Sequence, residues 1–257
     1  MSNENTSIHE FDLSLICEYY TAFHRQGPGS TESTLKALSF IDGLNEHSRI
    51  VDLGCGTGAP SLDLAKHTKA HITGLDMFQD FIDIFNANAE KAGLQNRLKG
   101  VTGSMDNLPF QKQSLDVIWS EGAIYNIGFK RGLKDWKPYL KPGGYLAVSE
   151  ACWFTNERPQ EIEDFWIPEY PEIDTIPVKI AQMQDAGYLP LAAFVLPETC
   201  WTDNFYSDQA AVQADFLKKH KGNSQAEEFA AYERHGAAMY DTYKDYYGYV
   251  FFVGQKL

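Results

Sequence analysis

The sequence predicts an α/β protein whose mostly parallel sheet is covered by helices on both faces. Short apolar runs alternate along the chain with segments in which apolar residues recur at helical spacing. A glycine-rich stretch, VDLGCGTG at residues 51–58, closes the first of these runs. With 257 residues and 44% hydrophobic content, the chain is long enough to bury one large core. Strands that alternate with helices favour a parallel sheet with both faces buried.

The N-terminal half of the chain supplies most of this alternation. A helix is predicted over residues 10–25, where four side chains share one helical face: Phe11, Leu15, Tyr19 and Phe23. The segment RQGPGST ends it, and a second helix is predicted from Ser30 to about Gly43. Strands are then predicted at residues 49–53, 70–76, 97–103, 115–122 and 145–151, with helices at 61–67, 79–92 and within 129–140. A turn is predicted at KPGG, just before the last of these strands.

The composition changes after residue 151. Residues 152–172 are rich in proline, acidic and aromatic side chains, and we predict a covering loop there. A helix at about 176–187 and a strand at about 191–196 should follow. Two polar helices are predicted within 207–243, and a closing strand at 247–256. These helices would interrupt a hairpin made by the last two strands.

Charge and cysteine content narrow the functional class. The formal net charge of −13 argues against a broad nucleic-acid surface, which needs a basic patch. No apolar run reaches the length of a membrane span, and the N-terminus lacks the basic and apolar regions of a signal peptide. The cysteines are scattered without a C-x-x-C pair: Cys17, Cys55, Cys152 and Cys200. We therefore predict a cytoplasmic protein with reduced thiols and no metal site.

The glycine-rich stretch has three possible interpretations. Gly54, Gly56 and Ala59 fit the dinucleotide fingerprint G-x-G-x-x-G/A, and Asp76 lies where that fingerprint has its ribose-binding acid. A plain structural turn would need only one glycine. Asp52, together with the lack of Lys or Arg in residues 51–65, instead favours a cationic ligand over a pyrophosphate.

Further motifs along the chain indicate the third interpretation. VDLGCGTG, an acid ending the next strand, GSMDNLPF, LDVIWSEGA and LKPGGYLAVSE resemble, in order and spacing, the class I S-adenosylmethionine-dependent methyltransferases. The small-molecule type, which includes ubiquinone and menaquinone biosynthesis enzymes, is the most similar, and residues 35–150 carry the resemblance. It implies a Rossmann-like, mostly parallel seven-stranded sheet with an antiparallel last strand. It also implies S-adenosylmethionine as cofactor, S-adenosylhomocysteine as product, and no metal.

The resemblance divides the chain as a single methyltransferase domain over residues 1–257. Its parts are an N-terminal helical cover (1–34), a cofactor-binding core (35–151), a lid segment with a helix and a strand (152–206), a helical insertion (207–246) and a closing strand (247–257).

Roles for the cofactor-binding residues follow from the same resemblance. Gly54, Cys55 and Gly56 would approach the methionine part of the cofactor, while Asp52 helps to hold its ammonium group. Asp76 would accept hydrogen bonds from both ribose hydroxyls, a task suited to an acceptor-only carboxylate, although a helix N-cap role is the alternative.

The adenine end and the fourth strand complete the predicted cofactor site. Met77 would flank the adenine, and the backbone N–H of Met105 would contact it. Ser104 stands where the family often has an acid, so either Ser104 or Asp106 would take over that contact. Ser120 would face the methionine end.

Acceptor-site residues are harder to identify because a sulfonium methyl group is already electrophilic and needs mainly alignment. Glu121, at a strand end, is the candidate catalytic or substrate-contacting residue, with a structural ion pair as the alternative. Tyr20 and Tyr125 are further substrate-binding candidates. Side chains that would either pack in the core or border the pocket are Tyr19, His24, Trp153, Trp166 and Tyr170.

The predicted function is methyl transfer to a small-molecule acceptor by a monomer or homodimer. A NAD(P)-dependent oxidoreductase and a non-catalytic S-adenosylmethionine-binding module are the alternatives. An acidic, aromatic pocket would suit an amine, but the sequence leaves the acceptor open. We further expect residues 10–30, 152–172 and 207–243 to close jointly over the acceptor.

Overall fold

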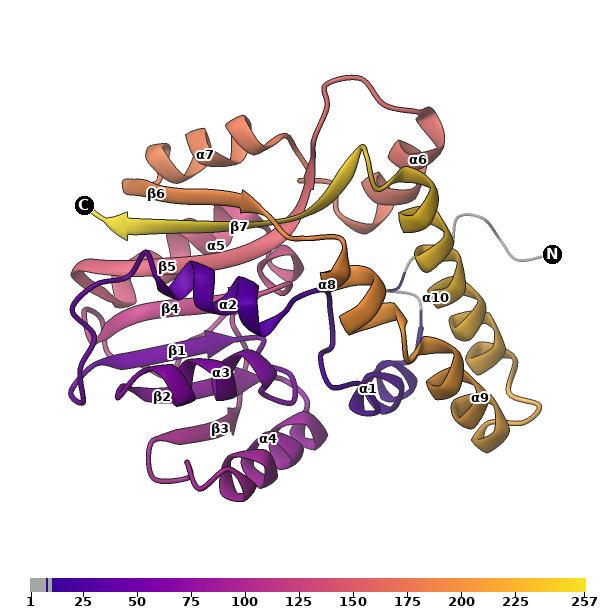
Figure 1. Ribbon diagram of the computed structural model, residues 1–257, viewed down its shortest axis with the longest axis horizontal. Coiled ribbons are helices and arrows are strands. Elements are labelled where there is room, and N and C mark those ends of the chain that lie inside the picture. The colour runs from indigo at the N-terminus through magenta and orange to yellow at the C-terminus, as the bar shows by residue number, and fades with distance from the viewer. Residues whose placement is uncertain (1–7, 9–10) are drawn as a thin grey trace.

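A computed structural model describes residue 8 and residues 11–257, and within that part of the chain seven strands form one sheet in the order β3-β2-β1-β4-β5-β7-β6 (Figure 1). The strands are β1 (Arg49–Leu53), β2 (His71–Asp76), β3 (Leu98–Thr102), β4 (Leu115–Glu121), β5 (Leu140–Trp153), β6 (Tyr188–Val195) and β7 (Tyr247–Lys256). Strands β1 to β5 pair in parallel, and β7 lies antiparallel between β5 and β6. The predicted fold class, including the antiparallel last strand, is confirmed.

Helices cover both faces of the sheet. The helices on these faces are α2 (Thr31–Leu38), α3 (Ala59–His67), α4 (Gln79–Lys91), α5 (Phe129–Trp136) and α7 (Ile176–Asp185), with short 3-10 turns η2 (Ile124–Asn126) and η3 (Lys137–Tyr139). One core cluster joins α2, α3 and α4 to the sheet, and a second joins α5 and α7 to its other face.

The alternation of side chains along the strands builds these two clusters. In β4, Val117 and Trp119 pack into the first cluster and Ile118 into the second. In β7, Phe251 and Phe252 divide in the same way. Because successive side chains of a strand point to opposite faces, continuous apolar runs are what a doubly covered sheet requires.

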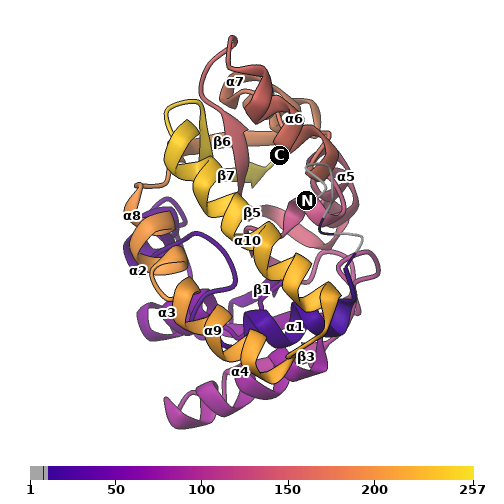
Figure 2. The same ribbon diagram turned by 90° about the vertical axis from the view of Figure 1, so that its right-hand side faces the viewer.

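The remaining helices lie at the carboxyl edge of the parallel strands. They are α1 (Leu13–Thr21), α6 (Gln160–Glu169), α8 (Thr199–Trp201), the π-helix η4 (Thr202–Tyr206), α9 (Gln209–Lys219) and α10 (Ser224–Tyr243). Figure 2 views the molecule from this edge, with α1, α9 and α10 in front. These three helices share a third cluster, which includes Tyr19, Phe216 and Phe229.

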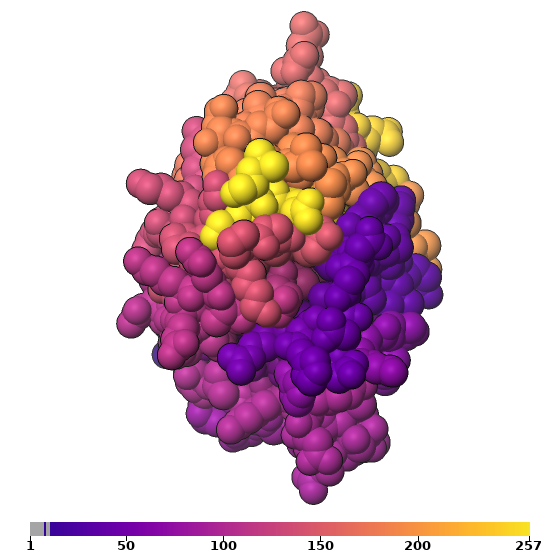
Figure 3. Space-filling model, turned by 90° about the vertical axis from the view of Figure 1, so that its left-hand side faces the viewer, coloured from indigo at the N-terminus to yellow at the C-terminus, as the bar shows by residue number. Residues whose placement is uncertain are grey.

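The closing hairpin is interrupted as the sequence predicts. Val195, near the end of β6, pairs with Val250 of β7, and α8, η4, α9 and α10 lie between the two strands in the chain. Figure 3 shows the opposite side of the molecule, where the yellow C-terminal end of β7 reaches the surface. No helix in the described ranges is long and apolar enough to cross a membrane.

Two local predictions were wrong. The covering loop expected at 152–172 instead extends β5 to Trp153 and then forms α6. The missed signal was helical spacing of Ile162, Phe165 and Trp166, with acidic residues in the first turn. The turn expected at KPGG is an irregularity within β5, where Gly143 adopts a φ of 73° and the register with β4 shifts.

Candidate active site

Two adjoining cavities open at the carboxyl edge of the sheet. The smaller one lies over the glycine loop and is lined by Asp52, Gly54, Gly56 and Glu121, among others. The larger one lies between the sheet and the helices of the carboxyl edge and has about 910 Å³ of empty space, its open mouth included. Both cavities share residues 26–28 and Gly122 as a common wall.

The glycine loop that follows β1 needs its glycines. Gly54, Gly56 and Gly58 have φ values of 71°, 52° and 91°, in the left-handed region that side chains rarely adopt. A Cβ on Gly54 would also overlap the Cβ of Ala123, and one on Gly58 would overlap the Phe85 ring. The loop therefore passes close to its neighbours, and its backbone borders the smaller cavity.

Asp76, at the end of β2, is tied to this loop. Its carboxylate accepts hydrogen bonds from the backbone N–H of Gly56 at 3.0 Å and of Phe78 at 3.1 Å. Burial raises its pKa, against the effect of these donors. The N-cap residue of α4 is Phe78, so Asp76 lies two residues before the helix cap.

Asp52 is a buried carboxyl group at the floor of the smaller cavity. It accepts a hydrogen bond from the Ser61 hydroxyl at 2.7 Å. Burial, with a smaller contribution from Glu121 and Asp76, raises its pKa to about 7. A cationic ligand in this cavity would stabilise the ionised form of Asp52.

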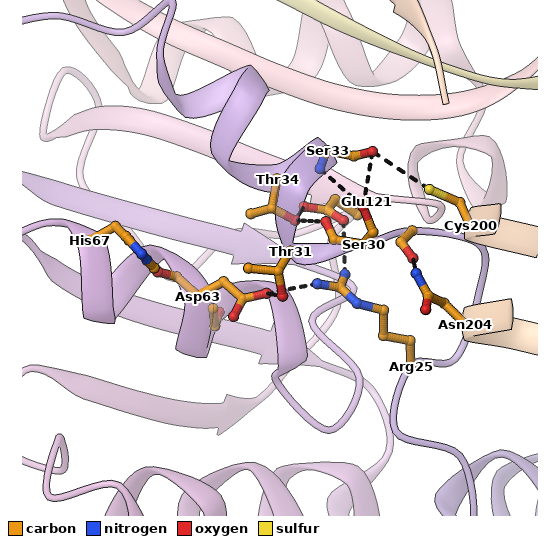
Figure 4. A network of polar contacts seen from close by, with 12 residues as sticks. Arg25, Ser30, Thr31, Ser33, Thr34, Asp63, His67, Glu121, Cys200 and Asn204 are labelled. Atoms are coloured by element: carbon orange, nitrogen blue, oxygen red, sulfur yellow. Dashed lines mark hydrogen bonds and ion pairs between the residues drawn. The ribbon is translucent and has the colours of Figure 1, made fainter. Parts of the chain in front are cut away.

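Glu121, at the end of β4, is held in a polar network (Figure 4). Its carboxylate accepts hydrogen bonds from Thr34 at 2.7 Å and Trp119 at 2.9 Å, and pairs with Arg25 at 3.2 Å. Arg25 also pairs with Asp63 at 2.8 Å. Glu121 lines the smaller cavity and is not among the residues lining the larger one. Through its ion pair with Arg25, Glu121 holds the segment that follows α1 against the end of β4.

That segment connects the glycine loop to the helices of the carboxyl edge. The Gln26 side chain accepts a hydrogen bond from the backbone N–H of Thr57 at 2.9 Å. Three residues on, the carbonyl of Gly29 accepts a hydrogen bond from Asn204 of η4 at 2.9 Å. Residues 25–28 line the smaller cavity, and residues 26–28 also line the larger one.

Aromatic side chains dominate the larger cavity. Of its twenty lining residues, eleven are Tyr, Phe or Trp, which come from α1, η2, α6, α8, η4, α10, β7 and the loop after α6. Tyr20 and Tyr125, both predicted to contact the acceptor, lie here. Trp166 and Tyr170, predicted either to pack in the core or to border the pocket, also line this cavity.

Two glutamates lie among these rings. Glu233 of α10 is 7% exposed and accepts a hydrogen bond from the Tyr20 hydroxyl at 3.0 Å. Burial, with a smaller contribution from the nearby Glu169, raises the pKa of Glu233 to about 7. Glu169 of α6 accepts hydrogen bonds from the backbone N–H of Ile8 at 3.3 Å and from the hydroxyl of Tyr232. Sequence analysis missed both glutamates.

A buried ion pair fixes the Tyr170 ring. Lys179 of α7 and Glu150 of β5 are fully buried and lie 2.6 Å apart, and the Tyr170 hydroxyl donates to Glu150 at 2.7 Å. Burial raises the pKa of Glu150, while Lys179 opposes that shift. These contacts fix the position of the Tyr170 ring in the wall of the larger cavity.

Other predicted residues lie elsewhere. Ser120 is buried, and its hydroxyl donates to the carbonyl of Leu53 at 2.8 Å, so it ties β4 to β1. The remaining ones are Met77, which is largely exposed; Ser104 and Asp106, which bond to each other on an exposed loop; His24, which is exposed; Tyr19, in the third cluster; and Trp153, under Arg158. Cys55 lines the smaller cavity, and the Met105 side chain lies close to Gly54.

No cluster of three or more His, Cys, Asp or Glu residues in the described part of the chain is placed to hold a metal ion.

The central part of the chain is similar in sequence to known proteins. A family described as a methyltransferase domain matches residues 50–144. Over 109 residues the chain is 32% identical to a sterol 24-C-methyltransferase of Gibberella zeae, covering 42% of this chain and 29% of that relative. The chain spans at most about half the length of the sterol methyltransferases that it matches, reaching 49% for the enzyme of Pneumocystis carinii.

Solved structures agree with the fold over almost the whole chain. A SAM-dependent methyltransferase from Geobacter sulfurreducens, in complex with S-adenosyl-L-homocysteine, has a TM-score of 0.82 at 18% identity and covers 96% of this chain and 99% of its own. The [4+2]-cyclase SpnF has a TM-score of 0.72 at 22% identity, covering 91% and 85%. At these identities the likeness establishes the fold alone, and this fold also occurs in a protein named as a cyclase.

Proposed function

We propose that this protein, whose residues 50–144 match a family described as a methyltransferase domain, is a class I S-adenosylmethionine-dependent enzyme that transfers a methyl group to a small-molecule acceptor. The observation that carries the proposal is the common wall of the two cavities at residues 26–28 and Gly122. A methyl donor over the glycine loop would present its reactive end to an acceptor in the neighbouring cavity.

The smaller cavity has the chemistry of a donor site. S-adenosylmethionine, when bound, supplies a methyl group on a positively charged sulfur. Asp52 would favour the ammonium end of the donor, and Asp76 would accept hydrogen bonds from its ribose hydroxyls. A Cβ on Gly54 would meet Ala123 and one on Gly56 would meet Gln26, so the loop that borders this cavity requires glycine at both positions. Cys55 and Met105 would complete this wall, with Met77, Ser104, Asp106 and Ser120 at the margins.

The helices of the carboxyl edge would position the acceptor and exclude water from it. Tyr20 of α1 and Tyr125 of η2 border the larger cavity, and α6 and α10 cover it. Alignment of two bound reactants can lower a barrier by about 7–11 kcal/mol at best, so no dedicated base is required for every acceptor. Glu121 would act in this scheme by holding residues 25–30 in place, and we further infer that these residues and α6 tighten when ligands bind.

The proposal also covers metal dependence, the acceptor class, the location and the oligomeric state. The donor binds without a metal, the acceptor is a small molecule and not a nucleic acid, and the protein works in the cytoplasm as a monomer or homodimer. An oxidoreductase using NAD(P) and a module that binds the donor without catalysis are the competing functions.

Calorimetry with S-adenosylhomocysteine in excess EDTA tests the donor site. We expect binding in EDTA, weaker or no binding of NADH, and at least a tenfold loss of affinity in Asp76→Ala. Each charge-assisted hydrogen bond that Asp76 makes with a ribose hydroxyl contributes about 1.5–3 kcal/mol. Asp83→Ala, which removes an exposed carboxylate of α4, is the matched control and should bind normally.

Two outcomes would contradict this assignment. Loss of binding in EDTA would require a metal, and unchanged affinity in a folded Asp76→Ala protein would leave Asp76 as a loop anchor alone. Single-turnover transfer of a labelled methyl group to a panel of small molecules separates an enzyme from a module that only binds the donor.

A further inference from the structure

The walls of the larger cavity combine aromatic rings with carboxyl groups and lack basic side chains. Among the described residues that line it, none is Lys, Arg or His. The ring faces of Tyr, Trp and Phe are electron-rich and attract cations, which gain most where water is excluded. A cavity built in this way is unfavourable for an anionic acceptor and favourable for a cationic one.

Glu233 supplies a negative charge that the protein itself does not neutralise. In the described part of the chain its carboxylate makes no salt bridge, and its hydrogen-bond donor is Tyr20, from α1. Glu169 of α6 also acts on this carboxylate. Besides Tyr20, the tyrosines that interact electrostatically with Glu233 are Tyr19 of α1, Tyr125 of η2, Tyr206 of η4 and Tyr232 of α10 itself. A buried carboxylate is costly without a partner of opposite charge.

We propose that the larger cavity binds the acceptor as a protonated amine, with the ammonium group held between aromatic faces and the carboxylate of Glu233. This inference rests on the proposed methyl transfer and names its substrate class. The acceptor nitrogen then lies in the cavity that borders the donor site at Gly122.

The same carboxylate can make the nitrogen nucleophilic. A proton passes from the ammonium nitrogen to Glu233, and the freed lone pair forms a bond to the methyl carbon of the donor. The bond between that carbon and sulfur breaks with its electron pair going to sulfur. The product nitrogen keeps a positive charge, and Glu233 then returns its proton to solvent. A carboxyl group whose pKa is raised to about 7 is suited to both steps.

Binding of a cation and its neutral carbon analogue tests the proposal without turnover. Choline and 3,3-dimethyl-1-butanol have the same shape and differ in charge. With S-adenosylhomocysteine bound, we expect at least a tenfold preference for choline, followed by calorimetry or by fluorescence of Trp166 and Trp201. Glu233→Gln should remove most of this preference, and Glu228→Gln, an exposed carboxylate of the same helix, should preserve it.

The pH dependence gives a second readout. Because the pKa of Glu233 is about 7, its carboxyl group is mostly protonated at pH 6, and choline affinity should fall about tenfold between pH 8 and pH 6. At pH 7, choline binding should release protons, measured as different heats in phosphate and Tris buffers. Both effects should disappear in Glu233→Gln.

Three results would overturn the inference: equal affinity for the two analogues, no choline binding at all, or a choline preference that survives in Glu233→Gln. If S-adenosylhomocysteine still binds and methyl transfer still occurs, the proposed function stands and only the amine acceptor is wrong. If S-adenosylhomocysteine does not bind, the methyltransferase proposal itself fails.

Discussion

The acidic side chains near the C-terminal ends of the parallel strands differ in the number of hydrogen bonds that they accept from the protein. This difference separates structural carboxylates from those that can bind a ligand. Glu121 accepts hydrogen bonds from three side chains and is saturated by the protein. Asp52 and Glu233 each have one described hydroxyl donor, and burial raises the pKa of each to about 7. Saturated carboxylates stabilise structure, whereas poorly partnered ones retain capacity for a ligand.

Glu121→Gln should lower the free energy of unfolding and leave the KM for the acceptor nearly unchanged. Both Arg25 and Glu121 are 6% exposed in their side chains, and breaking a buried pair leaves an uncompensated charge. Because Arg25 keeps Asp63, we expect a loss of about 3 kcal/mol, measured by urea denaturation. Asp135→Asn, in an exposed pair with Arg131, should cost less than about 1 kcal/mol. Unchanged stability with a raised KM for the acceptor would instead make Glu121 a substrate contact.

Among the elements, α1, α9 and α10 form a unit with its own core. Phe229 of α10 is fully buried and contacts the rings of Phe11, Tyr19, Tyr20 and Phe216. This core has no residue in common with the two clusters of the sheet, but Met239 and Tyr240, near the end of α10, belong to the first of those clusters. Helices α1, α9 and the first half of α10 can therefore open without unfolding of the sheet.

Phe229→Ala should loosen this unit selectively. Replacing a fully buried Phe by Ala costs about 3–5 kcal/mol. Native-state hydrogen exchange should show faster exchange in α1, α9 and the first half of α10 and unchanged exchange in β1, β4 and β5. Leu13→Ala, at an exposed position of α1, should leave both groups unchanged. Equal acceleration in the sheet would show that the helices and the sheet unfold as one.

The same division explains what could be predicted from the sequence. The strands and the glycine loop are specified locally, by apolar runs such as Leu115–Glu121 and by closely spaced glycines. The larger cavity is built from residues far apart in the chain, so no local pattern brings Tyr20 to Glu233. Helix α6 was missed because Pro168 and a high aromatic content masked its spacing, and this proline sits in the last turn, where it leaves most of the helix intact.

Over the whole molecule, buried carboxyl groups make stability depend on pH near neutrality. The ordinary pKa values of Asp52 and Glu233 are 3.8 and 4.5, and both rise to about 7 in the folded protein. Between about pH 5 and pH 7 the folded state therefore holds more protons than the unfolded chain, and stability falls as the pH rises through this window. Asp76 and Glu121 shift in the same direction, whereas the lowered pKa of Glu18 acts only in more acidic solution.

Thermal or urea unfolding without ligand should therefore show higher stability at pH 6 than at pH 8. The two groups together contribute about 2–3 kcal/mol across this interval. Asp52→Asn should reduce the difference by about 1.4 kcal/mol, because an amide does not titrate. A ligand-free protein that is more stable at pH 8 would mean that these carboxyl groups are ionised at little cost in the fold.

The interrupted hairpin has a consequence for how such a protein can diversify. Residues 196–246 leave and re-enter the sheet through neighbouring strands, with Val195 paired to Val250. They carry α8, η4, α9 and α10, and with them Glu233 and many of the rings around the acceptor. The donor half lies outside this insertion. A change of acceptor can therefore arise by exchange of one contiguous segment, provided the new segment preserves the bond to Gly29, which lies in the segment that contacts the glycine loop through Gln26. Recombination between related genes, or grafting in the laboratory, can exchange residues 196–246 at the ends of β6 and β7 without altering the rest of the sheet.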